Sequence, residues 1–159
     1  MTHFFKTMKS LVGELKLVAS DTGLAAILWE NDNPRRVRLP ELVESKKHPV
    51  LLETERQLQD YFAGKRTSFS VKLDASGTPF QKQVWAALRT IPFGETRSYG
   101  DIARQINNPK AVRAVGAANG RNPISIIVPC HRVIGSQGTL TGFAGGLETK
   151  ARLLALESP

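Results

Sequence analysis

The stretch SYGDIARQINNPKAVRAVGAA at residues 98–118 contains two short helical patterns separated by a tight turn. Ser98 predicts the N-cap of a first helix over 99–106, and Asn108 predicts the N-cap of a second, with Pro109 at its first position. Two short helices joined so closely in a basic segment are typical of a helix-turn-helix. Such motifs also arise by chance, so the function of this one must be inferred from the rest of the chain.

Downstream of this motif, the sequence predicts a buried strand, a wing and a last helix. Residues 124–128 are apolar and lead directly into PCHR at 129–132. Residues 133–143 resemble a hairpin or wing around the turn signal QG at 137–138. The last helix ends near Glu157, and its predicted inner face consists of Leu147, Ala151 and Leu154.

The first half of the chain has a different pattern, that of a small sheet with one helix. Residues 10–29 predict two strands on either side of the turn SDTG, residues 50–63 predict a helix, and residues 68–73 predict a further strand. Residues 74–79, DASGTP, are small and rich in residues that break helices and strands. The domain boundary is therefore expected there.

Two domains follow from this division. Residues 1–75 are expected to form an N-terminal α/β domain, a small sheet plus a helix. Residues 76–159 are expected to form a mostly α C-terminal domain with a winged helix-turn-helix. This domain opens with a helix over 80–88, whose buried face contains Phe80, Val84, Trp85 and Leu88.

The composition is that of a folded globular protein. The 159 residues are 41% apolar and 23% charged, enough for one ordinary domain or two small ones. The longest apolar run, at residues 24–29, is too short to span a bilayer, and the first ten residues lack the features of a signal peptide. We therefore expect a cytoplasmic protein. One cysteine and three scattered histidines predict neither an internal disulfide nor a metal site.

Positive charge is concentrated in the second half of the chain. The net charge is +8, and residues 78–159 hold 10 Lys and Arg against 4 Asp and Glu, whereas residues 1–77 hold 12 against 10. Such an asymmetry favours a polyanionic partner such as nucleic acid. A merely basic protein would show the same net charge, so charge alone leaves both interpretations open.

Cys130 is a candidate nucleophile. A lone cysteine is by default a small buried hydrophobic side chain. Here Pro129 stiffens the preceding backbone, His131 supplies a candidate base, and Arg132 adds positive potential that favours the thiolate. A thiolate beside a base is the minimum equipment for nucleophilic attack, so we expect an accessible, ionisable sulfur. Neighbours in sequence need not touch, however, and these residues alone leave a buried structural cysteine equally open.

The segment PCHRV at 129–133 strongly resembles the O6-alkylguanine-DNA alkyltransferase family. The same family pattern includes FGE at 93–95, SYG at 98–100, NPKAVRAVGAANGRNP at 108–123 and GGL at 145–147. The resemblance covers essentially all of residues 79–157, whereas residues 1–75 match only in their strand and helix pattern. It implies a ribonuclease-H-like N-terminal domain, and transfer of an alkyl group from guanine, with O4-alkylthymine as a further substrate, to the protein itself.

The resemblance also implies roles for single residues. Cys130 stands where the family has its alkyl acceptor. His131 and Glu157 stand where a histidine and a glutamate form a hydrogen-bonded relay that deprotonates the thiol through a water. Asn122 occupies the hinge between the recognition helix and the active-site loop. Tyr99 matches a tyrosine that crowds the target phosphate and donates a hydrogen bond to the purine.

The implied partner is double-stranded DNA that carries an alkylated guanine, bound by a monomer through the minor groove. Arg113 matches an arginine that enters the base stack and fills the gap left by the flipped nucleotide. The positions that line the DNA backbone in relatives are Gln81, Gly100, Asn108 and Ser136. The second helix of the motif fits this mode, because its small residues allow close approach and few of its side chains can read base edges.

Each assignment has an ordinary structural alternative. Glu157 lies two residues from the end of the chain, where a glutamate is usually a solvated helix end. Asn122 before a proline is a common turn residue. Tyr99 in the first turn of a helix is more often packed than reactive, and Arg113 on a basic helix is normally a phosphate contact.

The residue types suit an SN2 displacement at an alkyl carbon with guanine oxygen as the leaving group. A thiolate is the best protein nucleophile for a soft carbon centre. The thioether product resists hydrolysis, so we expect one event per molecule, with no turnover and no cofactor.

Two residues depart from the family pattern, and three rival functions are disfavoured. Phe143 replaces a tyrosine, and Ser125 replaces a proline found in some relatives' substrate pocket. Alkyltransferase-like proteins bind lesions without transfer but carry tryptophan in place of Cys130. A helix-turn-helix transcription factor would need a polar reading face and a dimer seam, and a thiol redox enzyme would need a resolving cysteine.

Overall fold

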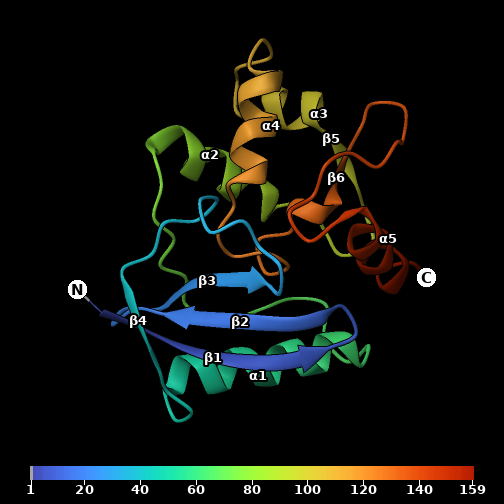
Figure 1. Ribbon diagram of the computed structural model, residues 1–159. Helices are drawn as coiled ribbons and strands as arrows, with labels where there is room; N and C mark the ends of the chain where they lie inside the picture. The colour runs from blue at the N-terminus through green and yellow to red at the C-terminus, as the bar shows by residue number, and fades with distance from the viewer. Residues whose placement is uncertain (1) are drawn as a thin grey trace.

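A four-stranded sheet and one helix form the first half of the chain in the computed structural model, which describes residues 2–159. The elements are β1 (Thr2–Ser10), β2 (Gly13–Ala19), β3 (Leu24–Trp29), β4 (Glu41–Glu44) and α1 (Pro49–Phe62). The strand order is β3-β2-β1-β4, with β1 antiparallel to β2, β2 antiparallel to β3, and β4 parallel to β1. In Figure 1, α1 lies on one side of this sheet and the second half of the chain lies beyond β3.

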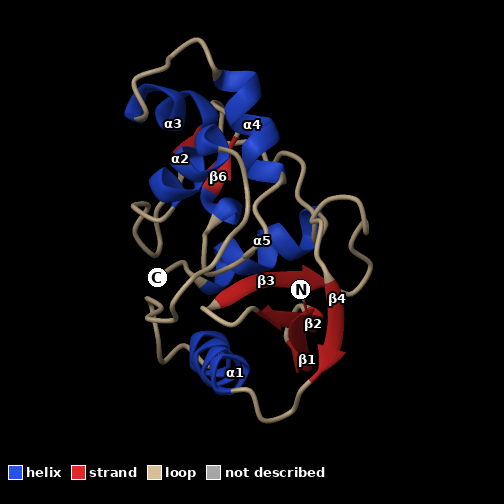
Figure 2. Ribbon diagram, turned by 90° about the vertical axis from the view of Figure 1, so that its left-hand side faces the viewer, coloured by secondary structure: helices blue, strands red, loops and turns tan. Residues whose placement is uncertain are grey.

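Short helices make up most of the second half. They are α2 (Pro79–Leu88), α3 (Tyr99–Gln105), α4 (Val112–Gly120) and α5 (Leu147–Leu156), together with a 3-10 turn η1 (Cys130–Arg132) and the two-residue strands β5 (Arg97–Ser98) and β6 (Val133–Ile134). β5 and β6 pair in parallel. In Figure 2 the strands of the first sheet lie together at one end of the molecule and most helices of the second half at the other. The predicted order of a sheet domain followed by a mostly helical domain is therefore confirmed.

Capping residues explain where two of these helices begin. Thr78 accepts a hydrogen bond from the backbone N–H of Gln81, and the side chain of Gln81 accepts one from the N–H of Thr78. Ser98 and Asp101 form the same reciprocal arrangement at the start of α3. Each pair satisfies two backbone donors that a helix start leaves free, which stabilises the helix by about 1 kcal/mol.

The free edge of β3 attaches the second half to the sheet. The N–H of Ile27 donates to the carbonyl of Pro123 at 2.9 Å, and Ile27 and Ile124 form an isolated parallel bridge. One hydrophobic core runs through both halves and includes Leu17 of β2, Leu58 of α1 and Val84 of α2. The segment that leads to Cys130 is therefore anchored to the edge of the sheet, which in turn leaves fewer unpaired backbone groups there.

The structure corrects several expected strands. β1 and β4 are additional to the strands expected from the sequence. Residues 68–73 are not a strand, because their only sheet-like contact is an isolated bridge between Leu73 and Leu24. Residues 124–128 are buried as expected but turn back on themselves, since Ile126 has a φ of 75° and the N–H of Val128 donates to the carbonyl of Ile124 at 3.0 Å.

The expected second helix of the motif and the expected wing also differ from the structure. α4 begins at Val112 after Ala111, and Asn108 is no N-cap, because its carbonyl instead accepts the N–H of Ala111 in a turn. Residues 133–143 contain no antiparallel hairpin, since β6 pairs with β5. A turn closed by the N–H of Gly135 and the carbonyl of Thr139, at 2.8 Å, surrounds the expected QG signal.

The inner face of α5 lies one residue away from the predicted one. Lys150 and Leu153 are buried, whereas Leu147 is 49% exposed and Ala151 is exposed. The hydrophobic pattern was misleading because a charged side chain occupies the buried stripe. None of the helices within residues 2–159 combines the length and the apolar character that crossing a membrane requires.

The turn between α3 and α4 gives a test of this local structure. Asn107 is exposed and has a φ of 61°, the left-handed region that Asn and Gly tolerate better than residues with an ordinary side chain. We predict that Asn107→Ala lowers the free energy of unfolding by about 1 kcal/mol, or roughly 3 °C in Tm, measured by thermal unfolding. Asn107→Gly is the matched control and should unfold within about 1 °C of the parent. Equal losses in both variants would contradict the assigned backbone conformation.

Candidate active site

Cys130 begins a tight turn whose backbone is fixed on both sides. Its N–H donates to the carbonyl of Val128 at 2.8 Å, and the N–H of Arg132 donates to the carbonyl of Pro129 at 3.0 Å. Pro129 has a fixed φ near its ordinary value, which ends the preceding segment and starts η1. The backbone on both sides of Cys130 is therefore held in a fixed conformation.

Two buried asparagines hold the segment around Cys130 in place. The amide of Asn122 donates to the carbonyl of Val128 at 2.8 Å and accepts the N–H of Ile124 at 3.0 Å, so it closes the 122–128 segment into a loop. Asn119 of α4 donates to the carbonyl of Cys130 at 3.4 Å. Asn122 thus links the end of α4 to the segment that leads to Cys130, and the contribution of Asn119 was missed by sequence reasoning.

The thiol of Cys130 is buried and protonated in the free protein. Only 5% of the residue is exposed. Burial raises the pKa of the thiol, and the opposing effects of the Asn122 amide and the charges of Arg36 and Lys150 do not offset it. The expectation of an accessible thiolate stabilised by Arg132 is therefore wrong, and a base has to remove the proton before the sulfur can react.

His131 and Glu157 are brought together by the fold. Nε2 of His131 lies 2.7 Å from Oε2 of Glu157, and both side chains are almost completely buried. Burial lowers the pKa of His131 more strongly than the hydrogen bond and charge of Glu157 raise it, so the imidazole is neutral at pH 7. Because Glu157 is ionised, Nε2 carries the proton and Nδ1 has a free lone pair. Nδ1 is buried and forms no hydrogen bond to any residue of 2–159.

The Glu157 carboxylate has further donors that the sequence did not reveal. Arg132 binds it through Nε at 2.7 Å and through Nη2 at 3.0 Å, and Tyr61 of α1 donates its hydroxyl at 2.5 Å. Burial would raise the pKa of Glu157, but the hydrogen bonds from His131, Arg132 and Tyr61 outweigh it and lower the pKa to about 2. Arg132 therefore acts on the carboxylate rather than on the sulfur.

Lys150 is buried, and its charge acts on both Cys130 and His131. Its Nζ donates to the carbonyl of Val133 at 2.6 Å and lies 3.4 Å from the carbonyl of Thr141. Desolvation lowers the pKa of Lys150, against an opposing effect of Cys130. These contacts hold the loop that follows β6 against α5.

Tyr99 and Trp29 both contact the loop that follows β6. The hydroxyl of Tyr99 forms a hydrogen bond with the hydroxyl of Thr141. Phe143 packs edge-on against Trp29, with ring centroids 5.4 Å apart. Gly145 faces the same indole so closely that an added Cβ would lie 2.8 Å from it. The sheet domain therefore sets the position of the loop through Trp29.

Arg113 projects from the exposed face of α4. It is exposed, and no ion pair or hydrogen bond to the side chain occurs within residues 2–159. Ala114 and Ala117 are exposed beside it, whereas Val115 and Ala118 are buried against the neighbouring helices. The small-residue run thus serves both helix packing and a low outer surface.

The four residues expected along a DNA backbone do not form one cluster. Gly100 and Ser136 line the same hollow, of about 600 Å³, between α3 and the turn after β6. Gln81 caps α2 and lines a separate pocket. Asn108 is exposed in the turn between α3 and α4.

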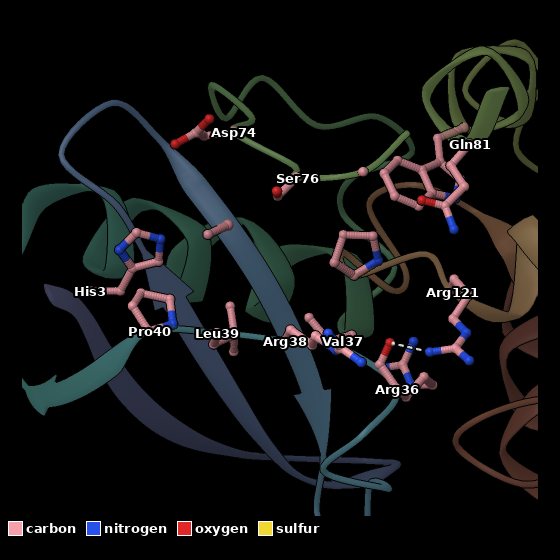
Figure 3. Close-up of a pocket in the computed structure, with 14 residues that line it drawn as sticks. His3, Arg36, Val37, Arg38, Leu39, Pro40, Asp74, Ser76, Gln81 and Arg121 are labelled. Carbon is pink, nitrogen blue, oxygen red and sulfur yellow. Dashed lines mark hydrogen bonds between the residues drawn. The ribbon is translucent and has the colours of Figure 1, made fainter. Parts of the chain in front are cut away.

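Hydrogen bonds of Arg36 and Arg121 join the loop after β3 to the end of α4. Asp32 binds Arg36 at 2.7 and 2.8 Å, and Nη1 of Arg36 donates to the carbonyl of Asn122 at 2.7 Å. Arg121 returns a hydrogen bond to the carbonyl of Arg36 at 3.4 Å, at one end of a pocket of about 560 Å³ shown in Figure 3. Cys130 does not line this pocket, so Arg36 contacts the backbone of Asn122 and acts on the sulfur only through its charge.

No metal-binding cluster accompanies these groups. Within residues 2–159, no group of three or more His, Cys, Asp or Glu side chains is arranged to hold a metal ion.

Comparison with known proteins covers the whole chain. The family profile described as "6-O-methylguanine DNA methyltransferase, DNA binding domain" matches residues 79–159, and the one described as "6-O-methylguanine DNA methyltransferase, ribonuclease-like domain" matches residues 4–75. A methylated-DNA–protein-cysteine methyltransferase of Methanosarcina acetivorans is 50% identical over 97% of each chain. The protein of the same name from Mycolicibacterium paratuberculosis is 64% identical over 96% of this chain and 91% of its own.

A solved structure has the same architecture. The crystal structure of Mycobacterium tuberculosis OGT in complex with DNA superimposes with a TM-score of 0.88 at 45% identity. The match covers 100% of this chain and 96% of that one.

The buried carboxylate gives a test of the site's energetics. Glu157→Gln should lower the free energy of unfolding at pH 7 by about 3 kcal/mol, because it leaves Arg132 buried without its ion-pair partner. A carboxylate with a depressed folded-state pKa contributes stability that is complete above about pH 4.5 and is lost as the pH falls toward about 2. The difference between variant and parent should therefore shrink over that range, measured by chemical denaturation at pH 7, 4 and 3.

Glu148→Gln is the matched control for this measurement. Glu148 lies in the first turn of the same helix, its side chain is 82% exposed, and it pairs only with exposed Arg152. Its substitution should leave the unfolding curve almost unchanged. If Glu157→Gln were as stable as the control at pH 7, the ion pair between Glu157 and Arg132 would not stabilise the fold.

Proposed function

Because the chain belongs to the 6-O-methylguanine DNA methyltransferase family, we propose that it repairs alkylated DNA by transferring the alkyl group from O6 of guanine to Sγ of its own Cys130. The observation that carries this proposal is the buried hydrogen bond between His131 and Glu157, with His131 next to Cys130 in η1. A protonated thiol needs a base, and the adjacent neutral imidazole supplies one.

The relay assigns a path to the thiol proton. The proton leaves Sγ and reaches Nδ1 of His131, through a water in the family's arrangement. Glu157 accepts the hydrogen bond from Nε2–H and stabilises the imidazolium that forms. Removal of the proton leaves a thiolate, which is the nucleophile.

The alkyl group passes from guanine to sulfur in one displacement step. The thiolate forms the S–C bond as the C–O6 bond breaks, and the bonding pair stays with guanine. Guanine takes up one proton, which replaces the one that left Sγ for His131 once the imidazolium gives it back, so the S–H and C–O6 bonds are exchanged for the S–C bond of the thioether and an N–H bond on guanine. A hydrogen bond from Tyr99 to the purine would stabilise the developing charge, once its hydroxyl exchanges Thr141 for the base. Since the thioether is not hydrolysed, each molecule reacts once and is inactivated.

The second half of the chain supplies the DNA-binding surface in this proposal. α3, α4 and the turn after β6 act as a winged helix-turn-helix, with the low surface of α4 in the minor groove and Arg113 in the base stack. The hollow lined by Gly100 and Ser136 receives the DNA backbone, with Gln81 and Asn108 as outer contacts. The crystal structure of the similar mycobacterial protein in complex with DNA supports this use of the fold.

We further infer the organisation of the protein around that activity. Residues 1–75 would form a ribonuclease-H-like domain and residues 76–159 the DNA-binding and alkyl-acceptor domain, acting as a monomer. An acceptor thiol must stay reduced, which suits the cytoplasm. O4-alkylthymine would be a second substrate, because it offers the same kind of alkyl carbon on an oxygen leaving group.

Intact mass tests the transfer step. After incubation with an oligonucleotide duplex carrying one O6-methylguanine, the protein should gain one methylene unit, located by peptide mapping on the fragment that contains Cys130. Cys130→Ser is the control and should bind the duplex without a change in mass, because a serine hydroxyl is a far weaker nucleophile toward a methyl carbon. An unchanged mass in the parent, under conditions where the duplex is bound, would support lesion binding without chemistry.

A comparison of two substrates tests the role of Arg113. Arg113→Ala should slow the reaction with a paired lesion roughly tenfold, because unstacking costs a few kcal/mol that the arginine helps to offset, yet stay within about twofold of the parent on free O6-methylguanine base. Arg152→Ala removes one positive charge far from α4 and controls for net charge. Equal losses on the duplex and the free base would contradict intercalation by Arg113.

A further inference from the structure

A tyrosine of the sheet domain reaches into the proton relay of the other domain. Tyr61 lies near the end of α1 and is 1% exposed. Its hydroxyl donates to Oε2 of Glu157 at 2.5 Å, and Glu157 is 96 residues away along the chain. Oε2 is also the oxygen that accepts the hydrogen bond from His131. In Figure 2 the C-terminus, which follows Glu157, lies between α1 and the helices of the second half.

The direction of this hydrogen bond is fixed by its partners. Glu157 is ionised and has no proton to give, so the phenol must be the donor. Burial raises the pKa of Tyr61, and the charge of Glu157 raises it further, so the phenol keeps its proton at any physiological pH. The tyrosine is therefore a permanent neutral donor and takes no part in proton transfer.

The shared oxygen gives Tyr61 an effect on His131. Oε2 accepts hydrogen bonds from Tyr61, His131 and Nη2 of Arg132, and each donor draws electron density from the same atom. A carboxylate oxygen that is already solvated by strong donors attracts the proton on His131 less strongly. Tyr61 thus has two consequences, since it fixes the orientation of the carboxylate and moderates its pull on the imidazole.

Packing alone does not explain the hydroxyl. The Tyr61 ring contacts three phenylalanine rings, those of Phe62, Phe69 and Phe93, with centroids 5.3 to 6.3 Å away. A phenylalanine would fill the same volume and make the same ring contacts. What distinguishes tyrosine at this position is the polar tip, and that tip points at the relay.

We propose that Tyr61 is a positioning residue for alkyl transfer, through which the N-terminal domain orients Glu157 and keeps His131 available as the base. This inference rests on the proposed function, because it assigns to Tyr61 an action on the His131–Glu157 relay. It also gives the N-terminal domain a part in the chemistry, although the nucleophile and the base both lie in the second half.

The charged and titratable groups around the relay come from three elements and from the loop after β3, whose Arg36 acts on Cys130 through its charge. α1 contributes Tyr61, η1 contributes Cys130, His131 and Arg132, and α5 contributes Lys150 and, at its C-terminal end, Glu157. The charges of Arg132 and Lys150 both lower the pKa of His131, and neither charge depends on the hydroxyl of Tyr61. Removal of the phenol hydroxyl therefore changes one donor and leaves both cations in place.

The pH dependence of single-turnover alkyl transfer tests the proposal. Tyr61→Phe should strengthen the pull of Glu157 on the imidazole proton and raise the pKa of His131, so the acid limb of the rate profile moves to higher pH by roughly half a unit to one unit. The rate on an O6-methylguanine duplex should fall roughly fivefold to tenfold at the acid end and stay within about twofold of the parent at pH 8. The ¹⁵N shifts of His131, followed over the same pH range, should report the same change without any reaction.

Thr54→Val is the matched control variant. Thr54 lies on the same helix, is fully buried, and donates only to the carbonyl of Val50 in its own helix. Its substitution removes a buried hydroxyl of α1 at a similar cost in stability but without contact with the relay. The pH profile and the His131 titration of this variant should follow those of the parent.

The outcomes separate this inference from the proposed function. If Tyr61→Phe follows Thr54→Val at every pH while the parent methylates Cys130, the tyrosine is only a packing residue and the inference is overturned. If the parent fails to methylate Cys130 at all, the proposed function itself fails. A raised His131 pKa in Tyr61→Phe together with unchanged duplex affinity, measured by fluorescence anisotropy, supports the role described for Tyr61.

Discussion

A single buried carboxylate organises this molecule. Glu157 sits at the C-terminal end of α5, where the helix dipole already disfavours negative charge, and its side chain is almost completely removed from water. An ionised group in such a place persists only when donors replace its hydration. Tyr61, His131 and Arg132 supply those donors, and they come from elements far apart in the sequence. The fold that brings them together is therefore also the fold that places His131 against Glu157, as the proposed relay requires.

The same requirement explains why the two halves form one structure. The phenol on α1 and the edge of β3 both contact the second half, the first at Glu157 and the second at Pro123. Arg36 adds a third connection by holding the carbonyl of Asn122, next to the loop that carries the cysteine. Cys130, His131 and Asn122 belong to the second half, yet the first half holds Asn122 through Arg36 and reaches the partner of His131 through Tyr61. A separated second half would lose contacts on both sides of Cys130.

Local sequence signals predicted those parts of the structure that depend on neighbours in the chain. The caps at Ser98 and the helices over 80–88 and 99–106 follow from residues within one or two turns. Long-range contacts were beyond such signals. Residues 50–63 were predicted as a helix and form α1, but nothing within that helix indicates that Tyr61 contacts a carboxylate 96 residues away. Lys150 misled the assignment of the inner face of α5, because its buried cation depends on the carbonyl of Val133. The family resemblance supplied roles for His131 and Glu157. Only the structure shows that Arg132 binds the carboxylate of Glu157 and not the sulfur of Cys130.

The protonated resting state of Cys130 suits a protein that reacts only once. An exposed thiolate is the form most readily oxidised or alkylated by small molecules, and any such event would consume the molecule without repair. Burial to 5% exposure and a raised pKa keep the sulfur in its less reactive form. In the proposed reaction, the neutral His131 accepts the proton as the S–C bond begins to form. In this scheme the thiol becomes reactive only in the complex with substrate. The burial that keeps the free thiol slow to react would therefore make the protein selective for its substrate.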